Sequence, residues 1–347
     1  MNDIIKCNKK NNQIQFLRAV FCFAILFYHF TYRYSEIYAA NNIFYNSFVQ
    51  QLSQVGLISF FIISGFYLIR RQPLNSNKEK LVYWIKRFLN IYIPYVFAVV
   101  FIFLLSLSGL LGVERTVSLI GFFQNFFFIN IITGQNVDGA HWYIFALLCL
   151  YVIAFIYDMI PKNENKEYLI FWIIVLSVSI ISLLVQKLAS DDSLFIKPFK
   201  IISYVMCRSY FLFVFVGITF YFFDYDIIRC KRNLLLLISM LITVMYVLYN
   251  NWIDFVIMFF SSLIIFMCLL RKFTVLEKIK TVVFLGNISF SLYLIHQNTG
   301  YMCLNFMTKY LNYYISLFIT IMVILIIGSL FYFLFEKNIK KLLSFIK

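Results

Sequence analysis

The chain has 347 residues, of which 63% are hydrophobic and 13% charged, and its formal net charge is +15. Soluble domains carry about 25% charged residues, and a soluble fold of this length cannot hide so many apolar side chains, because much of its surface faces water. The composition therefore excludes an ordinary soluble enzyme and predicts a protein embedded in membrane lipids.

Basic residues occur in short clusters between apolar runs. This pattern is typical of loops that face an anionic cytoplasmic leaflet. Since no basic stripe alternates with aromatic residues, we expect no nucleic-acid partner. The seven cysteines include no C-x-x-C pair, so neither a disulfide framework nor a metal site is indicated.

The apolar runs predict an all-α fold, a polytopic membrane helical bundle with about ten transmembrane helices, since one helical span needs about 20 mainly apolar residues. We expect residues 1–347 to form a single membrane domain without an appended soluble domain. The expected spans are 14–34, 52–70, 88–111, 141–160, 168–187, 201–223, 233–250, 252–270, 282–300 and 313–335.

An eleventh apolar segment, near 117–133, contains Gln124, Asn125 and Asn130. If it crossed the membrane, every later loop would change sides, and the basic clusters at 229–232, 271–280 and 337–347 would lie outside. Because cytoplasmic loops carry an excess of Lys and Arg, we predict that this segment is re-entrant or interfacial. The N- and C-termini are then both cytoplasmic, in what we expect to be a bacterial cell membrane.

Arg18 and His29 are the sharpest pair of polar residues in a predicted span. A helix turns about 20° beyond three full turns over eleven residues, so the two side chains share one face about 16 Å apart along the axis. An ionisable residue within the membrane is a functional hypothesis by default. Snorkelling of Arg18 to the headgroups is the alternative.

With these residues and four further motifs, the sequence resembles the acyltransferase-3 family of integral membrane acyltransferases. The family's R-x10-H motif is matched by Arg18 and His29, and its acidic residue at the end of the last span by Glu336. The other matches are FFIISGF at 60–66, KRFLNIYIP at 86–94, HWY at 141–143 and LGNISFSLYLIH at 285–296. The segment KRFLNIYIP departs from the family pattern, because Asn90 occupies the position of the pattern's second arginine.

The resemblance implies transfer of an acyl group, most commonly acetyl, from cytoplasmic acyl-CoA to a hydroxyl of a cell-surface or lipid-linked glycan. Acyl-CoA is then a co-substrate, and no tightly bound cofactor is expected. Arg18, Lys86 and Arg87 are the predicted acyl-CoA-binding residues, because they lie on the cytoplasmic side and such cations bind phosphate. His29 is the predicted catalytic residue, as a general base or as a transient acyl carrier.

Further residues are expected at the acceptor or along the cavity, and each has an alternative. Ser64 helps to orient the acyl group, or it serves helix packing beside Gly65. Trp142 stacks on a sugar, or it belongs to an interfacial aromatic belt. Arg208 binds an anionic group, or it pairs with an acidic residue. His141, Tyr293 and His296 complete the predicted set.

An exporter or flippase of a glycan or lipid-linked sugar is the alternative function, since many helices and buried polar groups suit both classes. Transporters often show two related halves with broken helices at matching places. The sequence shows no such duplication and has only 11 Gly and 4 Pro, which favours the enzyme.

Overall fold

A computed structural model describes residues 11–40, 42–68, 74, 76–112, 115–159, 177, 181, 210–226 and 252–346. All regular elements within these residues are helical, which confirms the predicted fold class. The described elements are, in chain order, α2 (Asn12–Tyr28), η1 (His29–Arg33), α3 (Tyr34–Tyr38), α4 (Ser47–Phe66), α5 (Asn77–Ser106), α6 (Leu119–Phe126), α7 (Asn130–Thr133), η3 (Gly139–His141), α8 (Trp142–Met159), α11 (Phe211–Asp226), α13 (Trp252–Leu269), η6 (Thr274–Lys278), α14 (Lys280–Met307), α15 (Tyr313–Phe331), η7 (Tyr332–Glu336) and α16 (Lys337–Ser344).

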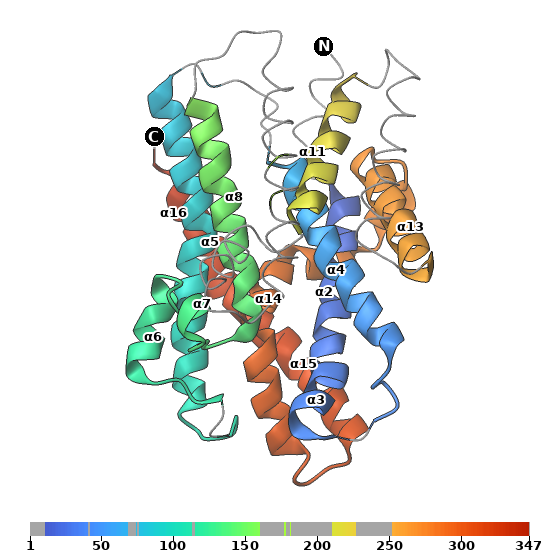
Figure 1. Ribbon diagram of the computed structural model, residues 1–347, viewed down its shortest axis with the longest axis vertical. Helices are drawn as coiled ribbons and strands as arrows, with labels where there is room; N and C mark the ends of the chain where they lie inside the picture. The colour runs from blue at the N-terminus through green and yellow to red at the C-terminus, as the bar shows by residue number, and fades with distance from the viewer. Residues whose placement is uncertain are drawn as a thin grey trace.

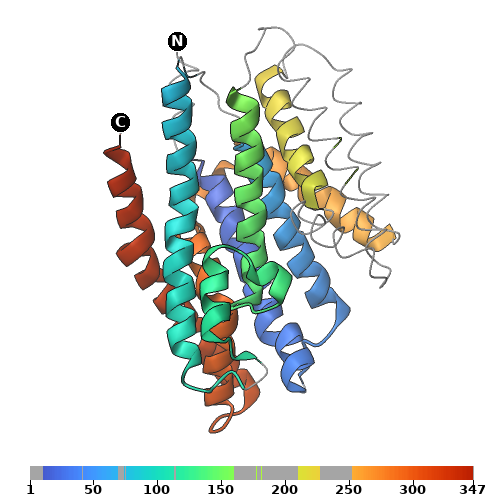
Figure 2. The same cartoon turned by 60° about the vertical axis from the view of Figure 1, so that its left-hand side comes forward.

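The long helices run along a common direction (Figure 1). The start of α5 and the ends of α8, α11 and α16 lie at the upper end of this view, whereas α3 and the connection between α14 and α15 lie at the lower end. Both views place α16 beside α5 at one edge of the bundle (Figure 2). The basic segments at 78–87 and 337–341 therefore share one end of the molecule.

Five helical stretches within the described residues are long and apolar enough to cross a membrane: Asn12–Tyr38, Ser47–Phe66, Asn77–Ser106, Gly139–Met159 and Tyr313–Ser344. Each overlaps a span expected from the sequence. The expected spans at 168–187 and 233–250 lie outside the described residues, apart from positions 177 and 181. The chain is thus a helical membrane protein.

The segment near 117–133 folds into two short helices, α6 with eight residues and α7 with four. A helix of eight residues is about 12 Å long, far shorter than a hydrocarbon core of about 30 Å. Asn125 ties α6 to the residues that follow α7, because its side chain donates to the carbonyls of Gly121 and Gln135 and accepts from the Val137 amide. This segment does not form a spanning helix, as predicted.

The start of α5 corrects one boundary. Residues 77–87, predicted as part of a polar connection, are the first turns of a helix of 30 residues. Ser76 caps this helix by accepting a hydrogen bond from the Glu79 amide at 3.2 Å, and such a cap stabilises a helix start by about 1 kcal/mol. Hydropathy detects only the apolar part of this helix, so it could not reveal the polar turns that precede the apolar part.

Helix α14 lies at the centre of the bundle, and 17 of its 28 residues are buried. It packs against α2 so closely that a Cβ atom on Gly286 would lie 1.7 Å from the Gln15 carbonyl oxygen. Near the other end, a Cβ on Gly300 would lie 2.1 Å from the Phe30 ring. Small residues allow such close approach between membrane helices. These two glycines set the distance of α14 from α2 and from η1, which continues α2.

We expect Gly286→Ala to lower the apparent unfolding temperature of the detergent-solubilised protein. The new methyl group must push backbone apart, and overpacking of this kind costs about 1–3 kcal/mol. Gly139→Ala is the matched control, because a Cβ there meets its nearest atom at 3.5 Å, an ordinary contact distance. Equal unfolding temperatures for the two variants would contradict this account of the helix contact.

Candidate functional site

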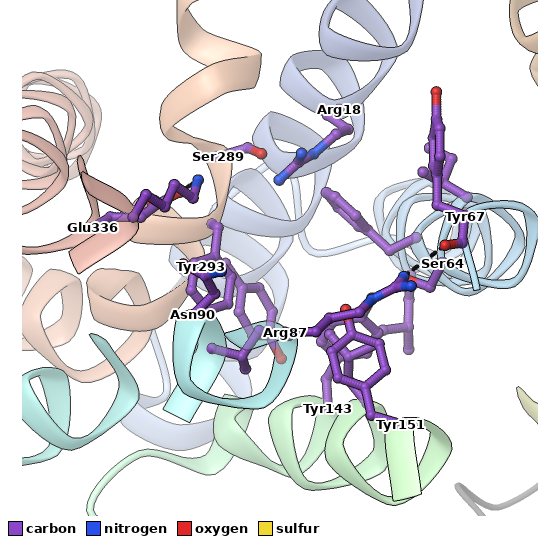
Figure 3. A pocket seen from close by; sticks show the side chains of 17 residues that line it. Arg18, Ser64, Tyr67, Arg87, Asn90, Tyr143, Tyr151, Ser289, Tyr293 and Glu336 are labelled. Atoms are coloured by element: carbon purple, nitrogen blue, oxygen red, sulfur yellow. Dashed lines mark hydrogen bonds and ion pairs between the residues drawn. The ribbon is translucent and has the colours of Figure 1, made fainter. Parts of the chain in front are cut away.

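A cavity of about 280 Å³ opens between α2, α4, α5, α8, α14 and the start of α16. Its polar lining is shown in Figure 3. The cations Arg18, Arg87 and Lys340 and the carboxylate of Glu336 face it, together with hydroxyl-bearing residues and Asn90. Three cations against one anion make the cavity suitable for a negatively charged ligand.

The directions of the helices order these groups by depth. On α5, Arg87 lies nearer the upper end of Figure 1 than Asn90 does, and on α8, Tyr151 lies nearer that end than Tyr143 does. On α14, Ser289 precedes Tyr293 by one turn toward the lower end. The cavity therefore leads from cationic groups at the end that carries the basic segments toward hydroxyl groups deeper in the bundle.

Arg87 is held firmly at the cavity's upper end. Its guanidinium donates to the carbonyl of Tyr67 at 2.7 Å and to the hydroxyl of Tyr83 at 3.0 Å. It also lies over the ring of Tyr151, 4.5 Å from the centroid, where a cation is attracted to the π face. These contacts fix the position of the charge while leaving other N–H donors of the fork for a ligand.

Arg18 has no hydrogen bond or ion pair within the part of the chain that the structure describes. Figure 3 shows its guanidinium extending toward Ser289 across the cavity. An arginine placed at membrane depth is costly unless it is paired or faces a polar space. Arg18 faces such a space, which makes it the least satisfied charge of the cavity.

Glu336 is 2% exposed and is the acidic group of the cavity. Its carboxylate accepts a hydrogen bond from Ser291 at 2.6 Å and pairs with Lys340 at 2.5 Å. Because Ser291 belongs to α14 and Lys340 to α16, the carboxylate links the central helix to the last one. The spacing of four residues between Glu336 and Lys340 is the usual one for a helical ion pair, a signal that we overlooked in the sequence.

The deep end of the cavity is closed by hydroxyl-bearing side chains. The hydroxyls of Ser64 and Tyr143 lie 3.1 Å apart and form a hydrogen bond. The rings of Tyr143 and Tyr293 meet edge to face at 5.5 Å, and Tyr293 donates its hydroxyl hydrogen to the Ala140 carbonyl. Next to Ser64, a Cβ on Gly65 would lie 2.2 Å from the Val214 carbonyl oxygen, so this turn of α4 also packs closely.

His29 and His296 meet beyond this closed end, with ring centroids 4.9 Å apart. His296 is fully buried, and its Nδ1 lies 2.7 Å from the Tyr293 carbonyl oxygen. A carbonyl only accepts, so Nδ1 carries the hydrogen. Neutral His296 then presents a lone pair at Nε2, which has no hydrogen-bond partner among the described residues. His29 is half-buried, and its Nδ1 lies 3.3 Å from the hydroxyl of Tyr301.

The residues before α8 attach to α14 beside these histidines. His141 Nε2 lies 2.8 Å from the Leu294 carbonyl oxygen, and Asp138 accepts from the Asn298 amide at 3.1 Å. The Leu294 carbonyl and the Asn298 amide are four residues apart, the spacing of one hydrogen bond within an α-helix. The loop before α8 is therefore attached to a single turn of α14. Asn298 also donates to the Val137 carbonyl at 2.6 Å.

The structure separates the predicted site residues into groups. Arg18, Ser64, Arg87 and Tyr293 line the cavity, and His29 and His296 lie together beyond it. The cavity lining includes Arg18 but not His29. The two residues therefore share a helix face toward α14 without sharing one cavity, and Tyr293 and His296 lie between Arg18 and His29. Lys86, His141 and Trp142 do not line the cavity: His141 holds α14, and Trp142 packs near Tyr210 and Phe61. Arg208 lies outside the described residues.

Comparison with known proteins adds the family. The sequence profile described as an acyltransferase domain, Acyl_transf_3, matches residues 11–334. No curated protein and no solved structure matches the chain. The profile covers the described helices from α2 to α15 and every residue placed around the cavity and the histidine pair except Glu336 and Lys340. The chain therefore belongs to the acyltransferase-3 family and is a membrane acyltransferase, and the exporter alternative is set aside.

Proposed function

We propose that this enzyme moves an acyl group, most commonly acetyl, from cytoplasmic acyl-CoA to a hydroxyl of a cell-surface or lipid-linked glycan. The observation that carries the proposal is the order of groups along the cavity. Cations come first, then a carboxamide, then hydroxyls, and beyond them two imidazoles. Acyl-CoA has the matching order of phosphates, amides and thioester.

The cations support the donor side of this proposal. Arg87 is oriented by the Tyr67 carbonyl and the Tyr151 ring, and Arg18 has no protein partner among the described residues. Charge-assisted hydrogen bonds from arginine to phosphate are about twice as strong as neutral ones. The basic end of the bundle would then face the cytoplasm, where the positive-inside bias places it.

The histidine pair supports the chemical step. The acceptor's hydroxyl oxygen attacks the thioester carbon, the carbon–sulfur bond breaks, and the coenzyme leaves as a thiolate that takes up a proton. His29 accepts the hydroxyl proton at Nε2, which requires that its Nδ1 carry hydrogen and donate to Tyr301. General-base assistance of this kind contributes about 10²–10⁴-fold.

Tyr143 and Tyr293 stand between the donor cavity and the imidazoles. The acyl group would reach His29 when one of these rings turns aside. A turn of Tyr143 would break its hydrogen bond to Ser64 at 3.1 Å, and a turn of Tyr293 would break its bond to the Ala140 carbonyl. A neutral hydrogen bond contributes about 1 kcal/mol, and the edge-to-face contacts of the Tyr143 ring with Phe61 and Tyr293 would be lost as well. With both rings in place, Tyr143 and Tyr293 would keep the thioester away from water on the histidine side when no acceptor is present.

His29→Gln tests the assigned base. We expect the acyl-ester content of the surface glycan to fall to background while the amount of polymer stays unchanged, because only the proton acceptor is lost. Nuclear magnetic resonance of purified polysaccharide measures both quantities. Loss of the polymer itself would support the exporter instead, and full acylation would remove His29 from the mechanism.

Arg18→Gln tests the donor site. We expect the KM for acetyl-CoA to rise by about tenfold or more at an unchanged unfolding temperature, because a charged hydrogen bond contributes about 1.5–3 kcal/mol and Arg18 has no described protein partner to lose. Arg33→Gln is the control, since Arg33 pairs with Glu36 at 2.6 Å on the surface near the other end of α2. A KM equal to that of the control would argue against phosphate binding at Arg18.

A further inference from the structure

Asn90 is an uncharged polar residue of the cavity for which the described residues supply no hydrogen-bond partner. Its carboxamide makes no side-chain hydrogen bond within the described residues, and its Oδ1 atom is buried. A buried acceptor without a partner costs about 1–3 kcal/mol. Native structures rarely keep such a group unless a ligand or water satisfies it. Because Asn90 lines the cavity, the hydrogen-bond donor that its Oδ1 atom lacks can come from a bound ligand.

The depth of Asn90 limits which part of a ligand it meets. It follows Arg87 by three residues on α5, which is about 4.5 Å further along the helix, and it precedes the closed end formed by Tyr143 and Tyr293. The group that meets Asn90 thus lies between the anionic part of the ligand and the part that reaches the hydroxyls.

The chemistry of the side chain limits the ligand further. In the motif that the sequence resembles, this position holds an arginine, which only donates hydrogen bonds, whereas a carboxamide both donates and accepts. A phosphate offers acceptors alone and would leave Oδ1 without a donor. A secondary amide offers one N–H and one carbonyl, and it satisfies both halves of the Asn90 side chain.

We propose that Asn90 binds an amide of the donor's arm, so that the cavity recognises the amide-bearing linker of a thioester as well as its phosphates. This inference rests on the proposed use of an acyl-CoA donor, whose arm carries two amides between phosphate and sulfur. Asn90 acts in binding and does not touch the reacting atoms.

The test pairs one substitution with one change in the ligand. Binding of acetyl-CoA, and of an analogue whose two arm amides are replaced by esters, is measured by calorimetry on the full chain in detergent. Esters remove the N–H donors and keep the carbonyls. We expect wild type to bind the analogue about 3- to 10-fold more weakly than acetyl-CoA, as for the loss of one hydrogen bond.

Asn90→Leu is the matching variant, because leucine has a similar size and no polar atom. We expect it to bind acetyl-CoA about 3- to 10-fold more weakly and to bind the two ligands equally, as a coupled pair requires. Its ligand-free unfolding temperature should equal or exceed that of wild type, since a buried unpaired group is removed. Asn338→Ala is the control, because Asn338 lies on the exposed side of α16 outside the cavity.

The outcomes separate the two proposals. If Asn90→Leu distinguishes amide from ester as wild type does, or if its defect is only a lowered unfolding temperature, the role of Asn90 is overturned and the acyl-CoA donor stands. If wild type binds no acetyl-CoA, the donor assignment itself is wrong and the amide site falls with it. Coupling that is confined to Asn90 supports both.

Discussion

The close contact between α2 and α14 is the constraint on which the rest of the site depends. Gly286 lies against the Gln15 backbone and Gly300 against the Phe30 ring, so the two helices are in contact over most of their common length. This contact brings Arg18 to the cavity beside Ser289 and brings His29 within 4.9 Å of His296. Two pairs of polar residues, each split between α14 and the continuous stretch formed by α2 and η1, are thus placed by one helix packing interaction.

The charges around the cavity differ in how the protein satisfies them. Arg87 and Glu336 each have more than one partner in the protein, so removing either one would leave other groups unpaired. Arg18 and Asn90 have none among the described residues. Folding alone does not require a polar side chain that costs free energy in this way. The division separates residues that hold the bundle together from residues whose partner is expected to arrive from outside.

Much of this arrangement could be predicted from composition and motif, and the exceptions have physical causes. Long apolar runs predict α4, α8 and α15 well, because lipid requires about the same helix length everywhere. The start of α5 was placed wrongly because a Ser76 cap and polar turns extend that helix beyond its apolar part. Helix geometry correctly places Arg18 and His29 on one face of their helix. It cannot show that Tyr143 and Tyr293, which come from other helices, separate them. The hydrogen bond from His141 to α14 depends on tertiary contact, which no spacing reveals.

The size of the cavity bears on what must pass through the membrane. Pockets that enclose a whole drug-sized molecule measure about 300–1,000 Å³, and this one measures about 280 Å³. With an acyl-CoA donor, the nucleotide therefore stays in water at the basic mouth, and only the slender arm enters. Moving a charged group into hydrocarbon is expensive, whereas an acetyl group carries no charge. With the proposed donor, the bundle would need no wide channel and no alternating opening, because the fragment that changes sides would be a small neutral acyl group.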